Sequence, residues 1–202
     1  MSYKLRIKGG KILKSKWKGI IISIIIFLLI ILVSCLIHIF YITIDIKDTS
    51  KVSKEISQEL LKSTQTECSN INIVSTFKEK NYVAIMSTYK LDKKQYISCF
   101  YFKRNRVFKG RYEICGGISD IKYGTVGYTC ISDTTENVIL VAGYNLPDEA
   151  KKYSVKLVED ETEIIKDINN NYILKLISID TANQSSINIK VELLDENYRR
   201  IK

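Results

Sequence analysis

Acidic side chains are the first candidates for chemistry in this sequence. Asp160, Glu161 and Glu163 lie close together after an apolar stretch. Two carboxylates can cleave a glycosidic bond, one as a general acid and the other as a base or nucleophile. Acidic clusters are also common in the solvent-exposed turns of soluble domains. A carboxylate-based hydrolase of the cell wall is therefore the least favoured function, and we assign no catalytic residues.

A neighbouring stretch has the spacing of a calcium ligand set. Asp167, Asn169 and Asn171 match the start of a calcium-binding loop. The glycine and the final glutamate of such a loop are replaced here by Tyr172 and Ser178. Asn and Asp side chains also form turns by hydrogen bonding to nearby backbone. We therefore predict a turn at this point, with no metal and no cofactor.

The distribution of histidine excludes several kinds of active site. The single histidine, His38, lies within a long apolar segment, and residues 45–202 contain none. Those residues cannot build a Ser–His–Asp triad, a Cys–His pair or a histidine-ligated zinc site. This distribution favours a protein that binds a partner and is not an enzyme.

A basic stretch is the candidate binding site. Its cationic residues are Lys103, Arg104, Arg106, Lys109 and Arg111, with aromatic residues among them and on either side. Cations beside aromatic rings can hold an anionic polymer such as a phosphate-rich wall polymer or DNA. The alternative is a charged hairpin tip whose rings fill the core. We prefer this alternative because the alternation of side chains along a strand sends half of the rings inward.

The net charge of +9 gives little further support for a nucleic-acid partner. Seven of the 31 lysines and arginines lie in residues 1–18, which contain no acidic residue. The other 24 lie in residues 45–202 together with all 22 acidic residues, so that region is close to neutral. The basic character is concentrated at the N-terminus, and we do not expect nucleic acid to be a partner.

An apolar segment determines the predicted topology. Residues 19–44 form a run of 26 without a charged side chain, which is enough for a helix across the hydrocarbon core of a bilayer. We predict a cytoplasmic tail over 1–18, a transmembrane helix over 19–46 and an extracytoplasmic C-terminal region in a single-pass protein of the cell membrane. The lipid bilayer is then its first partner. The cations that keep the N-terminus in the cytoplasm are Lys4, Arg6, Lys8, Lys11, Lys14, Lys16 and Lys18.

Two other fates of the apolar segment are alternatives to a permanent anchor. The run Leu32-Val33-Ser34-Cys35 matches a lipobox, which predicts a lipoprotein lipidated at Cys35. The order of a basic leader, Gly19, a long apolar helix and a β-rich head is similar to the layout of type IV pilins and pseudopilins. That resemblance implies a structural subunit of the envelope. These families have glutamate five residues after the processed glycine, and this chain has Ile24.

The remaining residues divide into a short helix and a β-rich domain. Val52, Ile56 and Leu60 repeat at helical spacing, which predicts an amphipathic stalk helix over 47–68. Over 69–202 the apolar period changes to two, which predicts a mainly β fold, an antiparallel β-sandwich or barrel-like domain of eight or nine strands. The predicted strands are 72–77, 81–89, 95–103, 106–115, 125–132, 137–144, 153–158, 172–179 and 187–193.

Two details of the basic hairpin follow from this assignment. A tight turn at Arg104-Asn105 pairs Cys99 with Gly110. The dipeptide Gly116-Gly117 is predicted to interrupt the strands after this hairpin.

The cysteines outside the apolar segment are Cys68, Cys99, Cys115 and Cys130. Four cysteines in an oxidising compartment permit two disulfides. A bond between Cys99 and Cys115 is disfavoured by the predicted register, and Cys115–Cys130 is the favoured pair. Four reduced thiols are an equally good interpretation.

Together these features predict a membrane-anchored protein whose extracytoplasmic domain is a non-enzymatic binding or interaction module. The expected ligand is an envelope protein or an anionic wall polymer. The alternatives are the pilin-like subunit, the Cys35 lipoprotein and the wall hydrolase.

Overall fold

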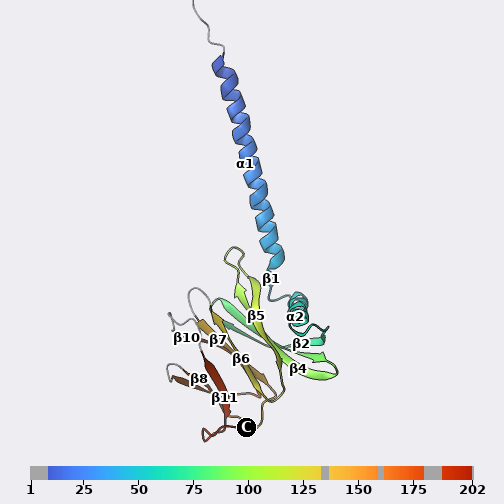
Figure 1. Cartoon of the computed structure of the whole chain (residues 1–202), viewed down its shortest axis with the longest axis vertical. Coiled ribbons are helices and arrows are strands. Elements are labelled where there is room, and N and C mark those ends of the chain that lie inside the picture. The colour runs from blue at the N-terminus through green and yellow to red at the C-terminus, as the bar shows by residue number, and fades with distance from the viewer. Residues whose placement is uncertain (1–8, 133–136, 159–161, 180–187, 202) are drawn as a thin grey trace, which may run out of the picture. The chain divides into compact units, whose positions relative to one another are not determined.

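The computed structural model describes residues 9–132, 137–158, 162–179 and 188–201. The chain divides into two compact units, Met1–Thr43 and Ile44–Lys202. The first unit holds one long helix, and the second holds a short helix and the β-strands (Figure 1).

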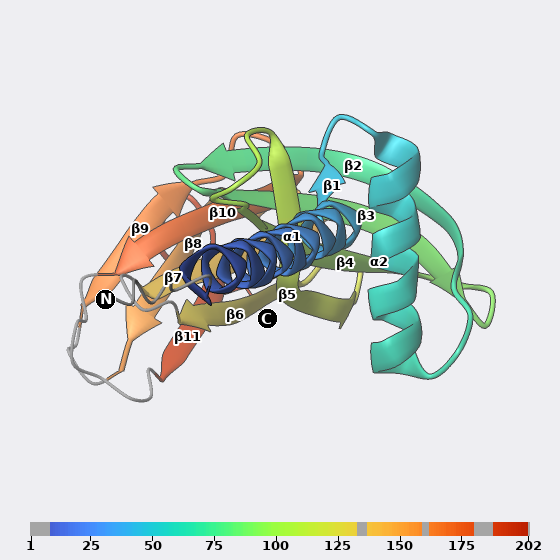
Figure 2. The same cartoon turned by 90° about the horizontal axis from the view of Figure 1, so that it is seen from above.

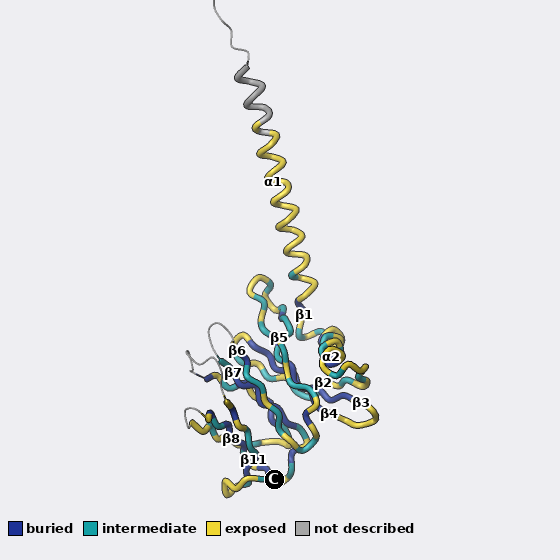
Figure 3. The backbone as a smooth tube through the Cα atoms, viewed as in Figure 1, coloured by how far each residue is buried: buried dark blue, intermediate teal, exposed yellow. Residues whose placement is uncertain are grey.

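The long helix of the first unit, α1, spans Gly9–Ile42. Its apolar part, Gly19–Ile42, has 24 residues with a mean hydropathy of 3.5, and none of it is buried within the protein (Figure 3). At ~1.5 Å per residue this part is about 36 Å long, more than the ~30 Å hydrocarbon core of a bilayer. The helix is therefore long and apolar enough to be a membrane anchor or a signal sequence.

The helix and the predicted membrane segment differ at both ends. The helix begins within the basic tail, so Lys11, Lys14, Lys16 and Lys18 belong to α1, whereas Lys4, Arg6 and Lys8 lie outside the described residues. At the other end the segment predicted over 19–46 is too long. Residues Ile44–Asp45 form strand β1 of the second unit.

The second unit is built from antiparallel sheets, which confirms the prediction of a mainly β fold. The sheets curl into a half-barrel (Figure 2). The five-stranded sheet has the order β1, β5 (Arg111–Ile121), β4 (Lys94–Arg104), β3 (Tyr82–Leu91) and β2 (Ser69–Glu79). The other two are β10 (Tyr172–Ile179), β7 (Asn137–Tyr144) and β6 (Val126–Ser132), and β11 (Ile189–Leu194), β8 (Lys152–Leu157) and β9 (Glu163–Asp167).

Strand β7 shows how the sheets are layered. Val138, Leu140 and Ala142 pack into one core cluster with side chains of β3 and β4. Ile139 and Val141 belong to a second cluster, which includes side chains of β8 and β11. Since successive side chains of a strand point to opposite faces, the middle sheet is covered on both sides. This accounts for the uninterrupted apolar sequence of β7.

The short helix α2 spans Thr49–Thr64 and covers the outer face of the five-stranded sheet. Its Asp48 N-cap side chain accepts a hydrogen bond from the backbone N–H of Lys51, which satisfies one of the free donors at the start of the helix. Val52, Ile56 and Leu60 have no exposed surface. The sequence predicted this helix and its apolar stripe correctly. It is, however, an integral part of the second unit and not a projecting stalk.

The hairpin between β4 and β5 differs from the prediction at its turn. A loop of residues 105–110 replaces the tight turn predicted at Arg104-Asn105. Cys99 therefore pairs with Ile118 and not with Gly110. The side-chain oxygen of Asn105 accepts hydrogen bonds from two backbone N–H groups of the loop, which favours the longer connection.

The predicted interruption at Gly116-Gly117 is also wrong, because both glycines lie inside β5. The register with β4 shifts just before them, where Cys115 is the extra residue between the pairs Tyr101–Gly116 and Phe102–Ile114, as in a β-bulge. A Cβ atom added to Gly117 would overlap with the carbonyl oxygen of Cys99. The glycine permits this close approach of two backbones and marks a bulge within the strand.

Two strands were not predicted from the sequence. β1 has only two residues, which is too short for any periodic signal. β9 begins at Glu163, within the acidic cluster that was assigned to a turn, and its side chains are largely exposed. The other two acids of that cluster, Asp160 and Glu161, lie outside the described residues.

Candidate functional site

A cleft of about 540 Å³ lies at one end of the five-stranded sheet. Five of its lining residues are cationic and one is acidic, Asp45. We refer to it as the cationic cleft, and its cations are Lys47, Lys78, Arg104, Lys109 and Arg111.

Strand pairing brings these residues together from distant parts of the sequence. Asp45 pairs with Arg111 across the β1–β5 ladder, and Arg104 pairs with Tyr112 across the β4–β5 ladder. Lys78 is near the end of β2 and pairs with Val83. The cleft therefore collects side chains from β1, β2, β4 and β5, together with Lys47 before α2.

The cleft has an apolar floor. Val83 and Tyr112 line it and are both buried in the cluster beneath α2. Lys47, Lys78, Arg104 and Lys109 stay exposed, so their charged ends can reach a ligand in the cleft.

The loop that carries Lys109 is held by Asn105. The side-chain oxygen of Asn105 accepts hydrogen bonds from the backbone N–H groups of Val107 at 2.8 Å and of Phe108 at 2.9 Å. The side-chain amide of Asn105 donates to Glu113. Turns of this kind fix the loop from its first residue. The position of Lys109 beside the cleft is therefore set by the fold.

Few acidic groups neutralise the cleft. Within the part of the chain that the structure describes, the side chains of Lys47, Lys78, Arg104 and Lys109 form no ion pair. Surface cations gathered on one side with so little compensation produce a positive field that attracts anions. The arrangement suits an oxyanion ligand such as a phosphate.

Three of the five predicted binding residues line this cleft. They are Arg104, Lys109 and Arg111, whereas Lys103 and Arg106 do not line it. Lys103 pairs with Tyr82 one residue along the β3–β4 ladder from the pair between Phe102 and Val83, so it projects from the opposite face of the sheet.

The aromatic residues of the same hairpin follow the structural interpretation of the sequence. Phe100, Phe102 and Tyr112 are buried in the cluster under α2, and Tyr101 packs on the opposite side against the central cluster. The rings thus fill the core, while part of the basic stretch gathers at the cleft.

Sequence reasoning missed Lys47 and Lys78. Lys78 stood in a predicted turn, and Lys47 stood at the start of the predicted stalk. Neither position carries a local signal of binding, because only the order of strands in the sheet brings them to Arg104.

A second hollow, of about 600 Å³, lies along β10. We call it the β10 groove. Asp167 and Asn169 of the calcium-like stretch line it, and the stretch leaves β9 and enters β10 as the predicted turn. Among the described residues, no group of three or more His, Cys, Asp or Glu side chains is placed to hold a metal ion.

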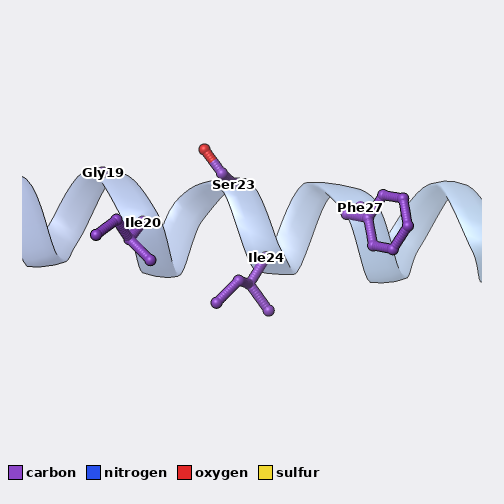
Figure 4. Close-up of a pocket in the computed structure, with 5 residues that line it drawn as sticks. All are labelled: Gly19, Ile20, Ser23, Ile24 and Phe27. Carbon is purple, nitrogen blue, oxygen red and sulfur yellow. The ribbon is translucent and has the colours of Figure 1, made fainter.

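A third hollow lies on α1 alone. It is lined by Gly19, Ile20, Ser23, Ile24 and Phe27, all from successive turns of one helix (Figure 4). Apart from Ser23 it presents no polar side chain. It is the space beside two small residues on an exposed helix, and it has no features of a ligand site.

No protein family model, curated protein or solved structure matches this chain. The function of the cationic cleft is therefore inferred from the chemistry of its lining residues.

The two cysteines of the predicted disulfide lie in different sheets. Cys115 is exposed on β5, and Cys130 lies on β6, packed against the cluster between the second and third sheets. The Cys115–Cys130 bond stays a prediction. Cys99 is fully buried, and burial raises the pKa of its thiol far above the ordinary value.

Proposed function

We propose that the protein is a membrane-anchored, non-enzymatic binding module that holds an anionic envelope component in its cationic cleft. The observation that carries the proposal is the convergence of five cations from separate segments around one carboxylate. Isolated surface lysines are common, but cations that meet in one cleft over an apolar floor are typical of a site that selects negative charge.

The membrane part of the proposal is supported by α1. Its apolar part is long enough to cross a bilayer. The seven cations before it favour a cytoplasmic N-terminus, which directs the second unit to the outer side of the membrane. An outer location favours a polymer or protein of the envelope over nucleic acid.

The lining of the cleft supports binding without catalysis. It offers cations, the carboxylate of Asp45 and the hydroxyl groups of Thr76 and Tyr112. The five cations outnumber the single carboxylate, which favours holding an oxyanion over acid–base chemistry. We therefore propose retention of an anionic ligand as the activity.

The test is the binding of poly(glycerol phosphate) to the full chain in nanodiscs of neutral lipid. The variant carries Lys78→Gln, Arg104→Gln and Lys109→Gln. The matched control carries Lys54→Gln, Lys90→Gln and Lys122→Gln, which are exposed lysines outside the cleft and change the net charge equally. Hydrogen bonds to charged groups contribute ~1.5–3 kcal/mol each, so we expect at least about a tenfold loss for the cleft variant. Equal binding by the two variants would contradict the proposal.

A further inference from the structure

The tip of the β4–β5 loop carries an exposed apolar side chain beside the cationic cleft. Val107 is 58% exposed, the same as Tyr198 and more than any other large apolar side chain in the described part of the second unit. It stands next to Arg106 and two residues before Lys109. The hydrogen bond from its backbone N–H to Asn105 holds this tip in place. An apolar side chain flanked by cations can enter a lipid interface while the cations contact the headgroups.

Chain connectivity keeps the cleft close to the end of α1. Thr43 and Ile44 alone separate Ile42 from Asp45, so the Cα atoms of Ile42 and Asp45 are at most about 11 Å apart. Arg111 is paired directly with Asp45, which adds about 5 Å. These limits hold for every orientation of the second unit. One wall of the cleft therefore lies within about 16 Å of the last residue of the apolar helix.

We infer that the cationic cleft and the Val107 tip dock on the phospholipid headgroups of the same bilayer that α1 crosses. The inference rests on the proposed function and names its ligand. Headgroup phosphates occupy the cleft, and Val107 enters the boundary between headgroups and acyl chains. The second unit is then attached to the membrane at two points, the covalent helix and the cleft.

Two observations favour lipid over a wall polymer as the ligand. The first is the tether, because a site joined to the membrane by so few residues meets headgroups at a high effective concentration. The second is Val107, since a soluble phosphate polymer offers no apolar layer to cover it. Anionic headgroups also attract cations near the surface, by about fivefold in affinity for each lysine or arginine.

The test places a fluorescent probe at the tip of the loop. The chain has a single tryptophan, Trp17, so the full-length variant Trp17→Phe/Val107→Trp reports from position 107 alone. It is studied in nanodiscs whose acyl chains carry bromine, which quenches indole fluorescence on contact. The lipids are phosphatidylcholine alone or phosphatidylcholine mixed with phosphatidylglycerol. We expect strong quenching in the mixed lipid and weaker quenching in the neutral one.

Two further variants serve as controls. Trp17→Phe/Val158→Trp places the same indole at another exposed valine, which follows β8 in a different sheet, and it should stay unquenched. It corrects for the affinity of indole itself for interfaces. Adding Arg104→Gln and Lys109→Gln to the Val107→Trp chain should lower the ratio of docked to undocked molecules by about 25-fold.

The outcomes separate this inference from the proposed function. If the indole at position 107 is unquenched in both lipids while poly(glycerol phosphate) still binds through the cleft, the lipid inference fails and the proposed function stands. If neither lipid nor polymer is bound, both fail. Quenching that is independent of phosphatidylglycerol and of the cleft cations would also overturn the inference.

Discussion

The cationic cleft and the β10 groove have similar volumes, about 540 and 600 Å³, but different linings. The groove has two lysines, Lys166 and Lys175, together with Asp167 and several aromatic rings. The ammonium group of Lys175 lies 4.8 Å from the ring centre of Phe77, so its charge already has a partner within the fold. The two hollows are therefore distinguished by the distribution of charge in their linings and not by their size.

The two hollows also differ in what supports them. The floor of the cationic cleft belongs to the cluster under α2, whereas the groove is lined by residues of β2, β8, β9 and β10 and of the connection between β9 and β10.

Leu60→Ala should destabilise the second unit by about 2–5 kcal/mol, because it leaves a cavity between α2 and the sheet that forms the cleft floor. Leu61→Ala is the matched control, since Leu61 is 45% exposed and its truncation should cost less than about 1 kcal/mol. Urea unfolding, monitored by circular dichroism on the full chain in detergent, measures both. Equal losses would show that α2 is not packed on the sheet.

Charge reversal should separate the two hollows in binding. Arg104→Glu/Lys109→Glu changes four units of charge at the cleft, and binding of poly(glycerol phosphate) should weaken by about 100-fold or more. Lys166→Glu/Lys175→Glu makes the same change in net charge at the groove. It should weaken binding by less than about threefold, as expected for remote charges in salt. If the groove variant loses more, the site has been assigned to the wrong hollow.

Asn105→Ala should loosen the cleft without removing a cation from it. The substitution deletes the hydrogen bonds from the N–H groups of Val107 and Phe108, and the one to Glu113. At about 0.5–1.5 kcal/mol each, the three bonds amount to about 1.5–4.5 kcal/mol, so we expect at least about a tenfold loss of anion binding if Lys109 becomes free to move. Isothermal titration measures the affinity, and Asn145→Ala is a control at another exposed turn. Unchanged affinity would show that the loop geometry is irrelevant to binding.

Alkaline pH should destabilise the fold in part through a buried tyrosine of the β10 groove. Burial raises the pKa of Tyr153, which lines the β10 groove, to about 12. The unfolded chain has an ordinary tyrosine pKa of about 10, so between pH 10 and 12 it loses this proton while the folded chain keeps it. The contribution of Tyr153 to stability is therefore complete below about pH 10 and is lost as the pH rises to about 12. Tyr153→Phe should reduce the fall, which unfolding curves at pH 9 and 11 would show.

The sequence predicted the elements better than their arrangement. The apolar run of α1, the stripe of Val52, Ile56 and Leu60, and the alternation along most strands are periodic signals within one segment, and periodicity follows from local geometry. Strands β1 and β9 were not predicted, because a two-residue strand has no apolar period and an exposed edge strand has a weak one.

The candidate site could be predicted only in part for a related reason. Arg104, Lys109 and Arg111 are neighbours in the sequence, so their clustering was visible there. Lys47 and Lys78 reach them through the order of five strands, which no local pattern specifies. The turn at Asn105 was misplaced because one side chain that binds two N–H groups favours a longer loop over a two-residue turn.

The two-residue strand β1 has a mechanical consequence. Any pulling force transmitted from residue 43 enters the second unit at Ile44 and Asp45, whose two pairs with β5 form the shortest ladder among the described sheets. Under tension, the β1–β5 ladder should separate before the other ladders. Its release would separate Asp45 from Arg111 and so dismantle one wall of the cleft while the remaining sheets stay intact.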